Sequence, residues 1–542
     1  MCMRLGHGVV VVTVLAGAVF GASPARAATT EVGPADNLET AWNALGPGDE
    51  LVLRGGTYDI TAGGRFSVDV AGTAAMPIVV RAKDGEHPHV VRTDANQNII
   101  DFVGAQHLTI RGIEFSGGSA GLRFSAGLNV TLEDCEIHST ADVALRANDT
   151  GATYEGFRIL RNHIHDTDGT GEGMYLGCNN AGCQFKDALI EGNHVHHTNG
   201  PTVSQGDGIE LKEGSSGNTI RDNVIHDTNY PCILTYSAAG NGGPNIIERN
   251  LLFRCGDHGI QAARDAVIRN NIILSAGSDG IAMQPHQSGA PQNLTVVHNT
   301  VLDVNGTCIS VRGATGSVVV ANNALYAMTG NAFFTNSTAS FLTVVGNAGL
   351  GGVSGITAPL VAGTLAGDFV AASFSGGVPN NVFPKTGSAL VAAGNATHVT
   401  LEDFNGTARA GAADVGAYVF NAAGNPGWML AEAFKGATPT LDAGVVPVDA
   451  GGGTPDAAVA VMLDGAVRPD AALGMDAGGV VPDAAVVNPA DAGAVTGADA
   501  ATGGGGGNTS RCSCAAFPEP RGWNALAAAA VCALMARWRR RR

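Results

Sequence analysis

GDGIELKEGSSGNTIRDNVIHDTN, residues 206–229, contains one full period of a pattern that recurs on both sides of it. Two short segments within it, 209–212 and 219–225, alternate apolar and polar side chains and are separated by a Gly/Ser turn. Alternation with a period of two indicates β-strands that bury one face. The stretch closes in a corner rich in Asn and Asp. It therefore predicts one coil of a repeating, strand-based fold.

The corner at Asn223 recurs at steps of 21 to 31 residues. Its counterparts are Cys135, Asn162, Asn193, Asn250, Asn271, Asn299, Asn323 and Asn347. Stacked amides hydrogen-bond along such a stack, and Asn tolerates the left-handed backbone of a tight corner. We predict an all-β fold, a right-handed parallel β-helix of single strands over residues 28–430. GPGDELVLRGGTY, residues 46–58, resembles the N-terminal cap of such proteins, with an amphipathic helix at 37–45.

The two ends of the chain differ from this body. Residues 1–27 combine Arg4, an apolar run and an A-x-A site, which predicts a secretory signal peptide. Residues 431–511 are rich in Ala, Asp, Pro and Gly and predict a disordered stalk. Within 441–500, nine Asp and one Arg supply −8 of the formal charge of −17. The body is thus mildly acidic, and nothing in it predicts nucleic-acid binding.

Residues 512–542 hold the pair Cys512 and Cys514, a short apolar run and an Arg cluster. This order resembles the C-terminal sorting tail of myxobacterial surface proteins. The apolar run is shorter than the roughly 20 residues of a free-standing transmembrane span, which suits a processed signal. The resemblance implies a secreted, cell-surface protein that is handled by the envelope sorting machinery. We expect the body to be a monomer.

Export permits disulfides. Cys178 and Cys183 bracket the loop CNNAGC and are the best candidates for a pair. Cys232 and Cys255 are about one coil apart, so they form either stacked thiols or a bridge.

A second strand column follows each corner, and its outward positions form rows of neighbouring side chains. The rows predict a cluster of Tyr175, Glu210, Lys212 and Tyr236 on adjacent coils. They place Arg146 in the same row as Gly177 and Lys212. Loops at 177–187, 199–206 and 237–244 adjoin this cluster and form the walls of a groove. Polysaccharide would lie in that groove. The candidate substrate-binding residues are Tyr175, Glu210, Arg146, Gln284, His286 and Arg312.

GDGIELKEGSSGNTIRDNVI, residues 206–225, resembles the catalytic coil of β-helix polysaccharide lyases of the alginate lyase and chondroitinase B type. The resemblance implies that Lys212 is the base that removes the proton α to a uronate carboxyl group. It also implies an Arg on the next coil as the acid and carboxylates before Lys212 that hold Ca²⁺. Tyr236 occupies the Arg position and is the candidate acid. Only Asp207 matches the acidic pair, because the other position is Gln205.

Other interpretations stay open. Lys212 is alternatively a solvated charge paired with Glu210 or Glu213. If a loop buries Lys212 in an ion pair, the lyase hypothesis with Lys212 as the base fails. Residues 284–286, Gln-Pro-His, resemble the D-P-H signature of mannuronan C5-epimerases, with Gln284 in place of Asp. His138, His165, His196 and His226 share one corner of four coils, which suggests either a metal site or turn capping.

The sequence thus predicts a protein that acts on or binds polysaccharide. The first hypothesis is a lyase that cleaves uronate chains by β-elimination, with Lys212 and Tyr236 as catalytic residues, and Ca²⁺ as the one cofactor considered. The second is a non-catalytic carbohydrate-binding or structural surface protein.

Overall fold

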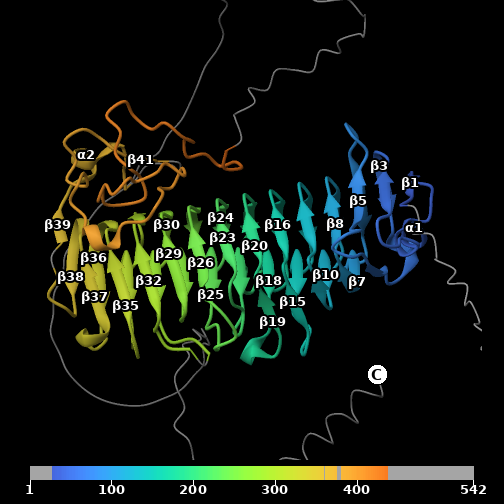
Figure 1. The fold of residues 1–542 in the computed structure, drawn as a ribbon, viewed down its shortest axis with the longest axis horizontal. Helices are drawn as coiled ribbons and strands as arrows, with labels where there is room; N and C mark the ends of the chain where they lie inside the picture. The colour runs from blue at the N-terminus through green and yellow to red at the C-terminus, as the bar shows by residue number, and fades with distance from the viewer. Residues whose placement is uncertain (1–26, 288, 359, 375–379, 437–542) are drawn as a thin grey trace, which may run out of the picture. The chain divides into compact units, whose positions relative to one another are not determined.

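The computed structural model describes residues 27–287, 289–358, 360–374 and 380–436. Most of the predicted signal peptide, the stalk from residue 437 and the whole sorting tail lie outside the described residues. Over the described part, parallel strands stack coil upon coil along one axis (Figure 1). Each complete coil contributes a strand to each of three faces, which confirms the predicted parallel β-helix.

The first face is a parallel sheet that starts each coil. Its strands are β1 (Thr29–Val32), β2 (Glu50–Leu53), β5 (Ile78–Ala82), β8 (Leu108–Arg111), β12 (Thr131–Glu133), β16 (Arg158–Leu160), β20 (Leu189–Glu191), β23 (Thr219–Arg221), β26 (Asn245–Glu248), β29 (Ala266–Arg269), β32 (Leu294–Val297), β35 (Val318–Ala321) and β37 (Leu342–Val345).

The second face follows the Asn corner. Its strands are β3 (Gly56–Asp59), β6 (Pro88–Arg92), β9 (Glu114–Gly117), β13 (Glu136–Thr140), β17 (His163–Thr167), β21 (His194–Thr198), β24 (Val224–Thr228), β27 (Leu251–Cys255), β30 (Ile272–Ala276), β33 (Thr300–Leu302), β36 (Ala324–Thr335), β38 (Asn347–Ser354) and β39 (Leu360–Ala362).

The third face carries the candidate site. Its strands are β4 (Ser67–Ala71), β7 (Ile100–Gln106), β10 (Leu122–Phe124), β14 (Leu145–Ala147), β18 (Met174–Leu176), β22 (Ile209–Leu211), β25 (Ile233–Thr235), β28 (Ile260–Ala262), β31 (Ile281–Met283) and β34 (Ile309–Val311). Three short strands, β11 (Gly127–Leu128), β15 (Thr153–Glu155) and β19 (Gln184–Lys186), extend it.

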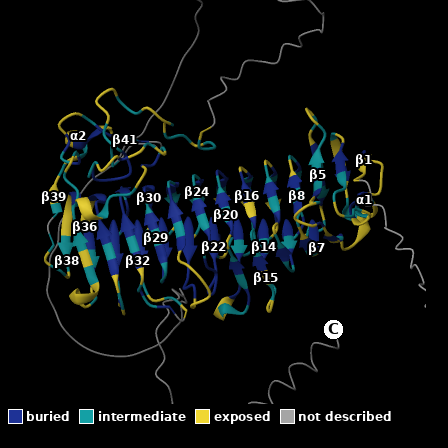
Figure 2. Ribbon diagram, in the orientation of Figure 1, coloured by how far each residue is buried: buried dark blue, intermediate teal, exposed yellow. Residues whose placement is uncertain are grey.

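Inward side chains from all three faces fill the interior of the coil, so the strands of the middle coils are largely buried while many turns between strands are exposed (Figure 2). On β22, for example, Ile209 and Leu211 are fully buried and pack in register with Met174 and Leu176. This is the alternation that the sequence predicted.

The corner amides form a continuous ladder. The side-chain oxygen of Asn223 accepts from the backbone N–H and the amide of Asn193, and its amide donates to the oxygen of Asn250 at 2.9 Å. The same pattern runs from Asn162 to Asn347. The prediction that the corner Asn itself adopts the left-handed backbone was wrong. The left-handed residue is the one before it, such as Asp222 or Arg249.

The N-terminal end is capped as predicted by a helix, α1 (Leu38–Asn43). Asn37 caps it by accepting a hydrogen bond from the backbone of Thr40. Trp42 is fully buried and contacts Phe66 and Phe102 of the first coils. The helix therefore covers strands whose backbone groups would otherwise be an open edge.

The C-terminal segment packs on the last coils and also runs back along the second face. It contains α2 (Leu365–Asp368) and the antiparallel pair β40 (Phe369–Ala371) and β41 (Asn381–Pro384). Arg409 reaches Asn270, and Lys435 bonds to Asp222 several coils back from the end. Residues 431–436, which composition assigned to the stalk, thus pack on the body. No helix in the described residues is long and apolar enough to cross a bilayer.

The described cysteines settle the pairing. Cys178 bonds to Cys183, as the loop sequence predicted, and Cys232 bonds to Cys255, which decides between bridge and free thiols. Cys135 and Cys308 are free and buried.

Candidate functional site

Strands β18, β22 and β25 place the candidate catalytic residues next to one another. Tyr175 on β18 lies in register with Glu210 on β22. Lys212 follows β22 and Tyr236 follows β25, and the Lys212 ammonium donates to the Tyr236 hydroxyl at 3.4 Å. The ammonium also lies 4.6 Å from the centre of the Tyr175 ring. The outward positions of adjacent coils thus bring Tyr175, Glu210, Lys212 and Tyr236 together, as the sequence repeat predicted.

Lys212, however, is buried in an ion pair. Its ammonium contacts Glu210 Oε1, and the two side chains are 5% and 1% exposed. Burial alone would lower the pKa of Lys212, but the Glu210 carboxylate outweighs it and the net pKa is raised. In the free protein Lys212 is therefore an ammonium ion, and it must lose a stabilised proton before it can serve as a base. This ion pair contradicts the lyase hypothesis in the form that makes Lys212 the base.

Glu210 belongs to a buried cluster of three carboxylates with Glu172 and Asp207, hereafter the acidic triad. Neither oxygen of Glu172 or Asp207 has a hydrogen-bond partner, and Glu210 Oε2 has none either. The hydroxyl of Thr170, which adjoins Glu172, donates to Asp142 instead. Burial, reinforced by the neighbouring carboxylates, raises the pKa of Asp207 well above its usual range and also raises that of Glu172. For Glu210, burial outweighs the attraction of Lys212, so its pKa is also raised.

The triad fits a hard divalent cation. Three carboxylates beside one ammonium leave a net negative charge in a buried place, and either protons or a cation must neutralise it. The ligand oxygens lie within 4.8 Å of one another, a separation that one Ca²⁺ with Ca–O distances of about 2.4 Å spans. Glu172, Asp207 and Glu210 would therefore hold the Ca²⁺ that the lyase resemblance implied for Asp207.

The triad predicts a pH dependence of stability that Asp207→Asn removes. Because the folded state raises the pKa of Asp207 above the usual 3.8, its protonated form stabilises the fold at low pH, and this contribution is lost as the pH rises through the folded-state value. As the pH rises from about 4 toward the alkaline range, the thermal midpoint of metal-free wild type should fall relative to that of Asp207→Asn. The difference between the two proteins cancels the effects of other titrating groups.

Added Ca²⁺ should raise the midpoint of wild type at the upper end of this range and leave Asp207→Asn unchanged. Asp257→Asn, on the rim of the same pocket, is the matched control and should behave as wild type. Equal pH profiles and equal Ca²⁺ responses for wild type and Asp207→Asn would show that the triad neither stores protons nor binds the cation.

A pocket of about 470 Å³ opens beside the ion pair. Asp207, Glu210, Lys212, Tyr236, Gln284 and His286 line it, together with Asn179, Gln205, Tyr230, Pro231, Leu234, Asp257, Gln261 and Gln287. The ring of His286 stacks on that of Tyr236 with centroids 4.7 Å apart. Burial and the Lys212 charge lower the pKa of His286, so its imidazole is neutral near pH 7. Burial and the Glu210 and Asp207 charges raise the pKa of Tyr236, so its phenol keeps its proton.

Three predicted substrate-binding residues are absent from the lining of this pocket. Tyr175 lies behind Lys212. Arg312 is held by Asp279 at 2.7 Å, and Arg146 bonds to Asn148. The predicted row of Arg146 was wrong. Arg146 pairs with Tyr175 and so lies in the neighbouring outward row, not in the row of Gly177.

Sequence reasoning missed Glu172 and a contact between two loops that line the pocket. Glu172 stands directly before Gly173 as Asp207 stands before Gly208, so the repeat contained the signal. This contact is a hydrogen bond of 2.8 Å from Gln287 to Asn179, which lies in the loop closed by the Cys178–Cys183 disulfide. The two residues are 108 positions apart in the chain. No periodicity predicts such a contact between loops.

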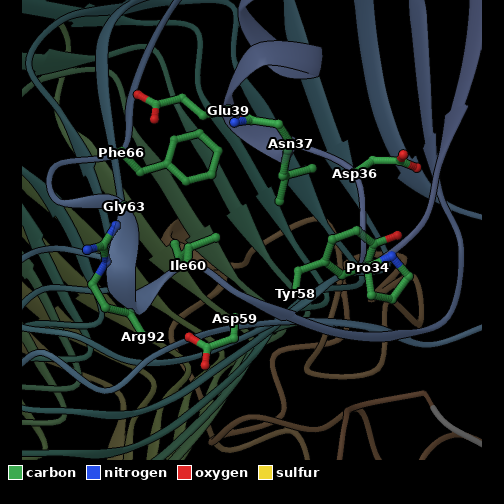
Figure 3. Close-up of a pocket in the computed structure, with 11 residues that line it drawn as sticks. Pro34, Asp36, Asn37, Glu39, Tyr58, Asp59, Ile60, Gly63, Phe66 and Arg92 are labelled. Carbon is green, nitrogen blue, oxygen red and sulfur yellow. The ribbon is translucent and has the colours of Figure 1, made fainter.

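A smaller pocket of about 220 Å³ lies beneath α1 (Figure 3). Figure 3 shows Arg92 facing it across from the side chains of Glu39 and Asn37. Arg92 is 1% exposed, and its Nε and Nη2 have no hydrogen-bond partner. None of the candidate residues lies here, so the third face remains the candidate site.

Comparison with known proteins agrees with the fold. The family described as "Right handed beta helix region" matches residues 86–204 and 184–325, so the class is a right-handed parallel β-helix. No curated protein matches. Among solved structures, the chain is similar to a pectate lyase, Pel9A, at 16% identity and a TM-score of 0.43, over 73% of this chain and 96% of that one.

Two further structures show the same likeness. An alginate lyase from Paenibacillus sp. str. FPU-7 is 19% identical, with a TM-score of 0.36 over 62% of this chain and 97% of that one. The A-module of the Azotobacter vinelandii mannuronan C-5 epimerase AlgE6 is 15% identical, with a TM-score of 0.37 over 60% and 91%. Likeness at this level concerns the course of the backbone and leaves the reaction open.

Proposed function

We propose that the pocket binds an acidic polysaccharide and removes the proton α to the carboxyl group of a bound uronate. The observation that carries this proposal is the meeting of an ammonium ion, a neutral imidazole and a protonated phenol in one pocket, at Lys212, His286 and Tyr236. Amide side chains such as Gln261 and Gln284 complete its lining and suit the hydroxyl groups of a sugar.

The protonation states assign the roles. The Lys212 ammonium would face the uronate carboxylate and stabilise the negative charge that develops there. His286, neutral near pH 7, would take the α-proton. As the C–H bond breaks, its electrons move toward the carboxylate and then expel the glycosidic oxygen, which receives the phenolic proton of Tyr236. The role of base thus moves from Lys212 to His286.

A cation held by the acidic triad would supply further charge neutralisation near the substrate carboxylate. Lys212 would remain the fixed charge of the site, because Glu210 and the Tyr236 hydroxyl hold its ammonium in place. The raised pKa of Lys212 thus suits a binding role.

We further propose that the protein acts outside the cytoplasm. The two disulfides of the described body suit an oxidising compartment. Export by the N-terminal segment and display through the C-terminal tail remain predictions from sequence, which secretion and surface labelling of the full chain would test.

The test of the reaction is a screen of uronate polymers. Alginate, pectate and glycosaminoglycans are incubated with the protein, with and without Ca²⁺, and the ultraviolet absorbance of the unsaturated product is followed while binding is measured by affinity electrophoresis. We expect one polymer class to be both retarded and cleaved. Retardation without new absorbance would favour a carbohydrate-binding protein without lyase activity.

A further inference from the structure

The second face carries two adjoining rows of histidines, none of which lines the pocket on the third face. In one row His138, His165, His196 and His226 lie in register on β13, β17, β21 and β24. Their rings stack with centroids 4.9 to 5.0 Å apart. In the adjoining row Glu136, His163 and His194 lie in register on three of the same strands.

Three of these rings converge. His163, His194 and His196 each offer a nitrogen within 4.8 Å of the other two. His163 Nε2 lies 2.7 Å from His196 Nε2, so these two nitrogens share one proton. Zn²⁺ binds imidazole nitrogens at about 2.0–2.1 Å. Replacing the shared proton with such an ion requires the two rings to separate only slightly.

Surrounding groups orient the rings for this role. His163 Nδ1 lies 3.4 Å from Glu136 Oε1, which leaves Nε2 for an ion. His194 Nε2 hydrogen-bonds to His226 Nε2 at 2.9 Å, and His226 Nδ1 lies 2.6 Å from Asp227. A carboxylate behind a ligating imidazole fixes the ring and its tautomer, as is usual in zinc sites.

The cluster lies beside a cavity. His163 and Glu136 line a cavity of about 620 Å³ that Phe434 of the C-terminal segment partly covers.

We propose that His163, His194 and His196 bind one divalent transition-metal ion of the class that prefers imidazole, with Zn²⁺ as the reference ion. Imidazole suits Zn²⁺, Cu²⁺ and Ni²⁺, whereas Ca²⁺ prefers the oxygen ligands that the acidic triad offers. The two clusters thus differ in metal selectivity. An ion held between β17 and β21 would link two successive coils and stabilise the stack.

The experiment uses the full chain without a polyhistidine tag, stripped with chelator and titrated with Zn²⁺ by calorimetry and thermal unfolding. We expect binding at this site to raise the unfolding midpoint. His163→Gln and His194→Gln should each weaken this binding by at least ~10-fold, the smallest effect usual for perturbing a metal site. His87→Gln, an exposed histidine outside the rows, is the matched control and should bind as wild type.

Co²⁺ supplies an independent readout, because nitrogen ligands around it give visible absorption bands that should disappear in His163→Gln. Cys512 and Cys514 lie outside the described residues, and binding to them would persist in both variants. If both variants bind Zn²⁺ as wild type does, or if wild type binds none, the proposal is wrong. Should His194→Gln fail to fold, the half-exposed His163 decides the outcome.

Discussion

Replacing Asn223 by Ala is expected to destabilise the β-helix by ~4 kcal/mol. The change removes the four hydrogen bonds that the Asn223 side chain makes with Asn193, Ile190 and Asn250. The backbone N–H of Asn193 and the carbonyl of Ile190 lose this partner. The Asn193 amide keeps its bond to Ile159, and the Asn250 oxygen still accepts from the backbone N–H of residue 223. Each unsatisfied buried group costs about 1–3 kcal/mol, and partial relaxation reduces the sum. Denaturant unfolding of wild type and variant measures the difference.

Asn199→Ala is the control, because Asn199 is exposed in the loop before the same coil. Its effect should stay within about 0.5 kcal/mol. In a solenoid each coil contacts only its neighbours, so loss of amide hydrogen-exchange protection should centre on the coils that hold Asn193 and Asn250. A loss for Asn223→Ala no larger than for Asn199→Ala would mean that the ladder does not hold the coils together.

The second large effect concerns turnover. Tyr236→Phe and His286→Gln are each expected to lower the rate on the responsive uronate polymer by about 10²–10⁴-fold, the usual contribution of a general acid or base. Tyr236→Phe keeps the ring that stacks on His286 but loses the proton donor. Polymer binding by Tyr236→Phe should therefore be retained while turnover is lost.

Tyr230→Phe is the matched control, because Tyr230 lines the same pocket but is 42% exposed and has no role in the assigned chemistry. It should turn over as wild type does. The roles assigned above are wrong if Tyr230→Phe and Tyr236→Phe lose activity equally, or if His286→Gln retains full activity.

The sequence predicted the backbone well because a solenoid repeats its own signals. Alternation placed Ile209 and Leu211 inside, and the corner period found the Asn ladder. The same register placed Lys212 beside Tyr236. Arg146 was misplaced because Val143 and Leu145 are both apolar, so the sequence pattern alone did not fix which of them starts the strand.

What the sequence did not predict depends on loops. The period gives the direction in which Lys212 points, but not that Glu210 and the surrounding loops bury it. His286 reaches Tyr236 from a loop two coils further on, and no repeat sets the course of that loop. These contacts changed the assignment of the base.

The central claim, removal of the uronate α-proton in the third-face pocket, is tested most directly by incubating wild type with uronate polymers in deuterium oxide. Magnetic resonance of the recovered chains and products then reports exchange at the carbon next to the carboxyl group. The account predicts deuterium incorporation or elimination by wild type and its loss in His286→Gln. A polymer that binds in the pocket, keeps all its α-protons and stays intact would contradict it.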